Sequence, residues 1–114
     1  MTFIEAIARE EGFEVAGSLA QRRNNPGNIV EGEFARTHGA LASDGNRFAR
    51  WDTPEAGFEA MRILLRIRYN GLTVAAAINK WAPPVENRTD LYVANVCKWT
   101  GLTPDSVLTN EVIG

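Results

Sequence analysis

The chain has 114 residues, of which 45% are hydrophobic and 23% charged, as is typical of one globular domain with a single core. Its formal net charge of -2 argues against a duplex nucleic-acid binder, which needs a basic surface to neutralise phosphates. One cysteine and one histidine form neither an intrachain disulfide nor a set of metal ligands, so we expect no metal and no cofactor.

The first half of the chain predicts one helix, a long loop and a small β region. Residues 2–11 place apolar side chains at helical spacing between Thr2, a suitable N-cap, and Gly12, which ends the helix. Residues 12–28 read as an irregular loop because glycine and proline interrupt them. Residues 28–30 are expected to be extended, and Ser43–Asn46 predicts a β-hairpin turn with residues 47–51 as its return strand, since Asp-Gly is a hairpin signal.

The second half predicts mainly helices. A long helix follows Thr53-Pro54 and ends at Asn70-Gly71, and Thr73 begins an Ala-rich helix that ends near Trp81. Another helix opens at residue 87 or 89 and closes at Gly101, and residues 103–105 predict a last helical turn. This order indicates a mainly helical α+β fold in one domain, residues 1–114, with a small β-hairpin after the first helix.

Glu11 is the main candidate for catalytic chemistry. Cleavage of a glycosidic bond needs a carboxylic acid in a partly apolar cleft to protonate the leaving oxygen. Glu11 terminates a helix with an apolar face, where the helix dipole disfavours a carboxylate, so helix stability does not account for its position. By position alone, solvated surface charges at Glu10 and Glu11 are the favoured reading, because most glutamates are exposed.

Several segments resemble one family in the same order along the chain. AREEGF is similar to the end-of-helix glutamate segment of lytic transglycosylases of the lysozyme superfamily. QRRNNPGNI, FARWDTPEAGFEAM and WAPPVENRTDLYVANV resemble segments of small phage and prophage proteins with lysozyme-like domains. The resemblance covers residues 4–108. It departs from the transglycosylase pattern at Gly12, where the family has serine, and where NPGN replaces a Gly-Leu-Met-Gln segment.

This resemblance implies a lysozyme-like fold and cleavage of the β-1,4 bond between N-acetylmuramic acid and N-acetylglucosamine in peptidoglycan. Glu11 would act first as general acid and then as general base. Tyr92 matches by position a tyrosine that lies near the catalytic acid in the family. With Glu11 alone, the muramic acid 6-hydroxyl would be the nucleophile and the product a 1,6-anhydro sugar. If Asp44, the candidate second carboxylate, held a water in the cleft, the outcome would be hydrolysis.

Further candidates for sugar binding come from the residues themselves. The amide of Asn25 is suited either to a sugar hydroxyl or acetamido group or to a local turn, whereas Asn28 is expected to serve the turn. Trp81, at a helix end before two prolines, offers a ring face for stacking on a pyranose. Glu86 is a further candidate contact, whereas Asn87 and Thr89 are explained as helix caps.

We expect peptidoglycan as the partner of a monomer that acts alone or within a virion or larger assembly. No apolar run predicts membrane insertion and no signal peptide is evident, so a phage-encoded endolysin would reach the cell wall by virion, holin or other machinery. The rival reading from another class is a non-catalytic virion or wall-binding protein, because fold alone does not confer activity. An inhibitor or effector that binds a protein partner is a third reading.

Overall fold

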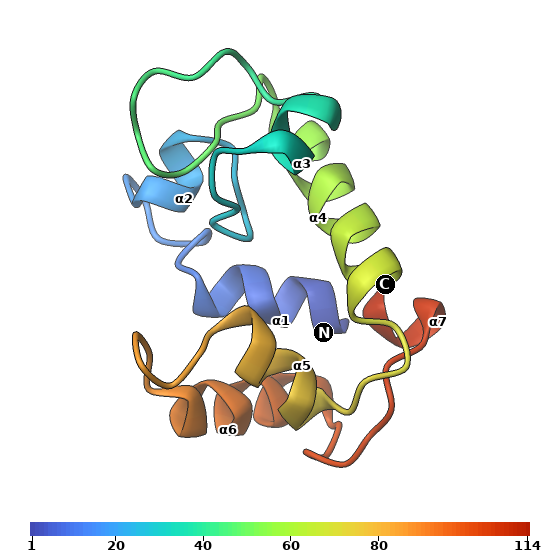
Figure 1. Cartoon of the computed structure of the whole chain (residues 1–114). Helices are drawn as coiled ribbons and strands as arrows, with labels where there is room; N and C mark the ends of the chain where they lie inside the picture. The colour runs from blue at the N-terminus through green and yellow to red at the C-terminus, as the bar shows by residue number, and fades with distance from the viewer. The chain divides into compact units, whose positions relative to one another are not determined.

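The computed structural model describes residues 1–114 and contains seven helices and no β-strand (Figure 1). The helices are α1 (Phe3–Glu10), α2 (Leu19–Arg22), α3 (Glu33–Thr37), α4 (Pro54–Arg68), α5 (Val74–Trp81), α6 (Thr89–Thr100) and α7 (Asn110–Ile113). Extended pairing is limited to two isolated bridges, Val30 with Phe48 and Thr73 with Val107. None of the helices has both the length and the apolar character needed to cross a bilayer.

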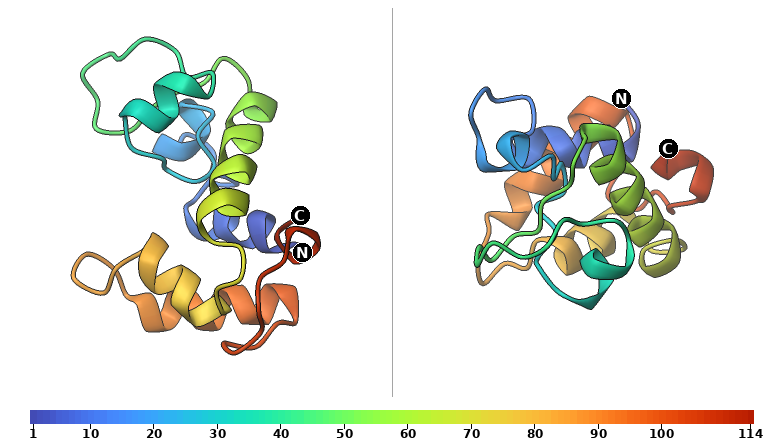
Figure 2. Two further views of the ribbon diagram at one scale, coloured as in Figure 1. Left: turned by 45° about the vertical axis from the view of Figure 1, so that its right-hand side comes forward. Right: turned by 90° about the horizontal axis from the view of Figure 1, so that it is seen from above.

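The expected α+β fold with a lysozyme-like β-hairpin is therefore wrong. The return segment, residues 47–51, pairs with residues 29–31 only around one bridge: Ala49 N–H donates to Ile29 O at 2.9 Å and Glu31 N–H donates to Arg47 O at 2.8 Å. On its other side, Leu41 N–H donates to Arg50 O at 2.9 Å. One isolated bridge and one further bond do not build the continuous ladder that two strands share. Residues 38–53 accordingly form an irregular loop, drawn without strand arrows in both views of Figure 2.

The chain divides into two compact units. Unit 1 comprises Met1–Ala6 and Leu64–Gly114, and unit 2 comprises Ile7–Ile63. Because the divisions fall inside α1 and α4, each of these two helices contributes residues to both units. Each unit has its own buried apolar side chains.

Unit 1 is organised by α5 and α6, which lie side by side in Figures 1 and 2. Thr73 caps α5 by accepting a hydrogen bond from Ala76 N–H, as its sequence predicts. Gly101 closes α6 in the left-handed conformation, with φ of 78°. Thr89 does not cap α6; its hydroxyl is buried and donates to Ala82 O at 2.6 Å, which ties the start of α6 to the end of α5.

The last helical turn is displaced from its expected place. Residues 103–105 are not helical, and α7 forms instead at Asn110–Ile113. Thr109 caps α7, and Ile113 anchors it because the Ile113 side chain is fully buried. A helix of four residues is too short to form without such tertiary anchoring, so local propensity did not locate it.

Unit 2 contains two short helices: α2 lies in the segment that was expected to be an irregular loop, and α3 follows the segment that was expected to be extended. Ser18 caps α2 by accepting from Gln21 N–H, and Ala20 and Ala35 are buried on α2 and α3. Trp51 is almost fully buried, and its indole N–H donates to His38 O at 3.0 Å. The irregular loop is therefore held by specific buried contacts rather than by a sheet.

Candidate functional site

Glu11 follows the last residue of α1 and caps its C-terminus. Gly12, in the left-handed conformation with φ of 88°, donates its N–H to Arg9 O at 3.1 Å, and Phe13 N–H donates to Ala8 O at 3.0 Å. These paired bonds form the Schellman motif that commonly ends a helix at glycine. The motif fixes the backbone of Glu11, whose residue is partly exposed.

Asn28 contacts the Glu11 carboxylate. Its side-chain Nδ2 donates to Glu11 Oε1 at 2.9 Å and to the Glu11 backbone oxygen at 3.2 Å. The backbone of Asn28 has φ of 49°, in the left-handed region that asparagine tolerates better than most residues. The donated hydrogen bonds offset the unfavourable position of a carboxylate at a helix C-terminus.

The other side-chain atom of Asn28 lacks a hydrogen-bond partner. Oδ1 is buried and accepts from no donor, although buried acceptors are usually satisfied because an unmade hydrogen bond costs about 1–3 kcal/mol. The strained backbone and the unsatisfied oxygen are both typical of functional sites. Asn28, which the sequence assigned to a turn, is therefore brought to the candidate acid.

Asn25 has a different environment. Its side chain is fully buried, Nδ2 donates to Ile29 O and Ala49 O, both at 2.9 Å, and Oδ1 accepts from Ile29 N–H at 2.8 Å. This side chain presents no accessible polar atom to a ligand. Asn25 joins the residue 25–29 turn to the loop that carries Ala49, and so supports the backbone from which Asn28 projects.

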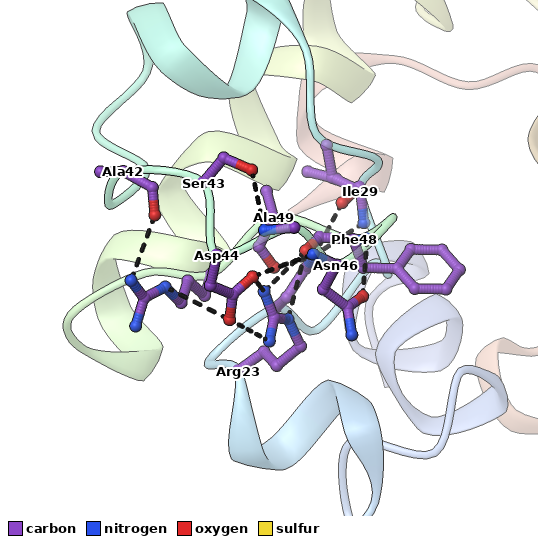
Figure 3. A network of polar contacts seen from close by, with 11 residues as sticks. Arg23, Ile29, Ala42, Ser43, Asp44, Asn46, Phe48 and Ala49 are labelled. Atoms are coloured by element: carbon purple, nitrogen blue, oxygen red, sulfur yellow. Dashed lines mark hydrogen bonds and ion pairs between the residues drawn. The ribbon is translucent and has the colours of Figure 1, made fainter.

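Asp44 forms an ion pair with Arg23 (Figure 3). Its carboxylate accepts hydrogen bonds from Arg23 Nη1 at 3.0 Å and Arg23 Nη2 at 2.8 Å, and Arg23 also binds Phe48 O. The Arg23 guanidinium and the Asn46 backbone N–H hold the pKa of Asp44 well below its usual range. The Asp44 carboxylate is therefore ionised, and its ion pair with Arg23 stabilises the irregular loop.

The remaining candidates, Tyr92, Trp81 and Glu86, lie in unit 1. Tyr92 is buried and Glu86 is exposed. Trp81 is half-buried and makes an edge-type aromatic contact with Tyr69, with the two ring centroids 5.4 Å apart. Unit 1 also has an open groove of about 470 Å³. It is lined by Asn79, Pro84, Asn87, Arg88, Thr89, Asp90 and Val93. None of the three candidates lines this groove.

No group of three or more histidine, cysteine, aspartate or glutamate side chains is arranged to hold a metal ion. Cys97 is a free thiol on α6, and burial raises its pKa. A thiol with a raised pKa is a weaker nucleophile at neutral pH.

No family model matches the chain. It is similar to Protein P5 of Pseudoalteromonas phage PM2, with 33% identity over 96 residues. The aligned region covers 79% of this chain and 60% of the phage protein, so the chain corresponds to only part of that relative's length. The expected phage connection is confirmed in this coarse form: the chain has a phage-encoded relative.

Proposed function

We propose that the chain cleaves the β-1,4 bond between N-acetylmuramic acid and N-acetylglucosamine in peptidoglycan, with Glu11 as the only general acid and base. The observation that carries the proposal is the Glu11 carboxylate at the end of α1, bound at 2.9 Å by the strained Asn28. The similarity to a phage protein supports the setting. The proposal relies on this pair and not on a lysozyme-like fold.

The proposed reaction needs one proton carrier. Protonated Glu11 gives its proton to the glycosidic oxygen as the bond to the muramic acid C1 breaks, which leaves an oxocarbenium-like sugar and an ionised Glu11. Glu11 then removes the proton of the muramic acid 6-hydroxyl, whose oxygen bonds to C1 and closes a 1,6-anhydro ring. Glu11 is thereby reprotonated and no water is consumed.

The Arg23–Asp44 ion pair favours this anhydro product over hydrolysis. A second carboxylate that activates or positions water must have a free oxygen, whereas Asp44 accepts two hydrogen bonds from Arg23. Hydrolysis remains the alternative outcome of the same Glu11 acid step, with water in place of the 6-hydroxyl.

The test is digestion of purified peptidoglycan by the wild-type chain and by Glu11→Gln, with fragments identified by mass spectrometry. Glu10→Gln is the matched control, because it changes the neighbouring glutamate on the same helix. The expected result is release of anhydro-ended fragments by the wild type and by Glu10→Gln but not by Glu11→Gln. Reducing ends would indicate a muramidase instead.

A different result would favour the non-catalytic reading. If the wild type releases no fragments yet sediments with intact sacculi, the chain is a wall-binding protein and the enzyme proposal is wrong. If Glu11→Gln releases fragments as fast as the wild type, Glu11 is not the acid. Digestion and sedimentation with sacculi thus both test peptidoglycan as the partner.

A further inference from the structure

The amide orientation of Asn28 is set by two acceptors at once. Nδ2 lies within hydrogen-bond distance of both Glu11 Oε1 and the Glu11 backbone oxygen. The opposite orientation would place Oδ1 against the backbone oxygen, which is always an acceptor. The backbone carbonyl therefore keeps Nδ2 facing Glu11 whether the carboxyl group is ionised or protonated.

This orientation distinguishes the two carboxyl oxygens of Glu11. In a protonated carboxyl group one oxygen is a carbonyl acceptor and the other carries the proton. Because Oε1 always faces an N–H donor, a proton on Oε1 would remove its hydrogen bond and place two donors against each other. We infer that Asn28 is a positioning residue that keeps Oε1 as the carbonyl oxygen of Glu11 and so places the transferable proton on Oε2. This inference rests on the proposed function.

Two features of Asn28 agree with such a role. Its left-handed backbone, with φ of 49°, turns the amide toward a helix end that is 17 residues earlier in the chain. Its Oδ1 is buried without a donor, so the hydrogen bonds of Nδ2 to Glu11 are retained although the other end of the amide is unsatisfied. A residue that served only the turn would satisfy both ends of its side chain locally.

The variant Asn28→Gly removes the amide and leaves the backbone unstrained, because glycine adopts positive φ readily. Asn24→Gly is the matched control: Asn24 has φ of 51° and its Nδ2 donates to a backbone carbonyl, that of Trp51, at 3.0 Å. We expect Asn28→Gly to lower kcat on soluble glycan strands roughly tenfold to a hundredfold with little change in KM, because proton delivery depends on geometry. Asn24→Gly should retain kcat.

A second variant replaces the donor by a carboxyl group. In Asn28→Asp, the introduced group can donate to Oε1 only while it is protonated, so activity should persist only toward acidic pH and the optimum should move down. The neighbouring charged groups, Glu10 and the ion pair of Arg9 with Glu14 at 3.3 Å, are the same in every variant. A purely structural asparagine would lower activity at all pH values without moving the optimum.

A measurement that does not need activity separates this inference from the proposed function. In the ¹H–¹⁵N NMR spectrum, one Nδ2 proton of Asn28 should shift as the wild type is acidified and yet remain downfield, because it still donates to a carbonyl oxygen. In Glu11→Gln the signal should not respond to pH.

Collapse of the wild-type signal to the position of an exposed amide would overturn the inference, as would equal kcat values for Asn28→Gly and the wild type. Equal losses in Asn28→Gly and Asn24→Gly would also overturn it, because they would trace the effect to the turn. A wild type that cleaves nothing but shows the expected NMR response would refute the proposed function and leave the orientation of Glu11 by Asn28 established.

Discussion

Replacing the buried Asn25 by alanine should destabilise the protein more than any other single amide deletion in unit 2. The side chain is fully buried and makes three hydrogen bonds to backbone groups, at 2.8–2.9 Å. At about 0.5–1.5 kcal/mol net for each bond, the loss is roughly 2–4 kcal/mol. Alanine removes the partner of Ile29 N–H and of Ala49 O, whereas Ile29 O keeps the hydrogen bond from Ala49 N–H. For a chain of this length that corresponds to a fall in Tm of roughly 10 °C.

Asn25→Asp should be worse than Asn25→Ala. Its carboxylate can still accept from Ile29 N–H but would face two carbonyl oxygens, those of Ile29 and Ala49, without a proton to donate. The matched control is Asn79→Ala on α5. The Asn79 side chain is exposed and donates to Ala75 O at 2.8 Å, so its loss should change stability by less than about 0.5 kcal/mol.

The assay is equilibrium urea unfolding followed by circular dichroism, together with thermal scans of the three variants and the wild type. A loss below about 1 kcal/mol for Asn25→Ala would refute the reasoning, because it would mean that the three hydrogen bonds are not collectively stabilising. A loss for Asn79→Ala as large as that for Asn25→Ala would show that burial is not the deciding factor.

Two more predictions concern the loop and the start of α4. A Cβ at Gly57 would overlap Asn24 O and lie 3.0 Å from Pro26 Cδ, so Gly57→Ala should destabilise by about 1–3 kcal/mol or more, whereas Gly32→Ala, with open space around it, should be nearly neutral in thermal scans. The lowered pKa of Asp44 means that the unfolded chain binds its proton at higher pH, so the stability from Arg23–Asp44 is complete at neutral pH and is lost on acidification. The difference in Tm between wild type and Asp44→Asn should therefore shrink from pH 7 toward pH 2, and a constant difference would contradict this account.

The helices that the sequence predicted well are those with both amphipathic spacing and a local cap. α4 begins after Thr53, whose hydroxyl accepts from Ala56 N–H at 3.1 Å, and α5 begins after Thr73 in the same way. α1 likewise ends at a glycine-based cap, which is why Glu11 could be placed at a helix end from the sequence alone. These signals act within a few residues and need no knowledge of distant contacts.

The hairpin prediction failed because its turn signal has a second explanation. Asp44-Gly45 is a common hairpin turn, but the Asp44 side chain binds Arg23, which is 21 residues away. The segment after the turn forms only an isolated bridge with residues 29–31 and one bond to Leu41. The short helices α2 and α3 were missed for a related reason, since four or five residues are marginal as helices without buried anchors such as Ala20 and Ala35.

The sequence by itself determined the helical character of both ends of the chain and the position of Glu11 at the end of α1. The tertiary structure decided which asparagine meets Glu11: Asn25 became a buried structural residue and Asn28 the partner of the carboxylate. That choice depends on a left-handed backbone at Asn28 and on hydrogen bonds across 17 to 24 residues of chain. Local patterns carry no information about such long-range contacts, because both asparagines flank the same Pro-Gly turn.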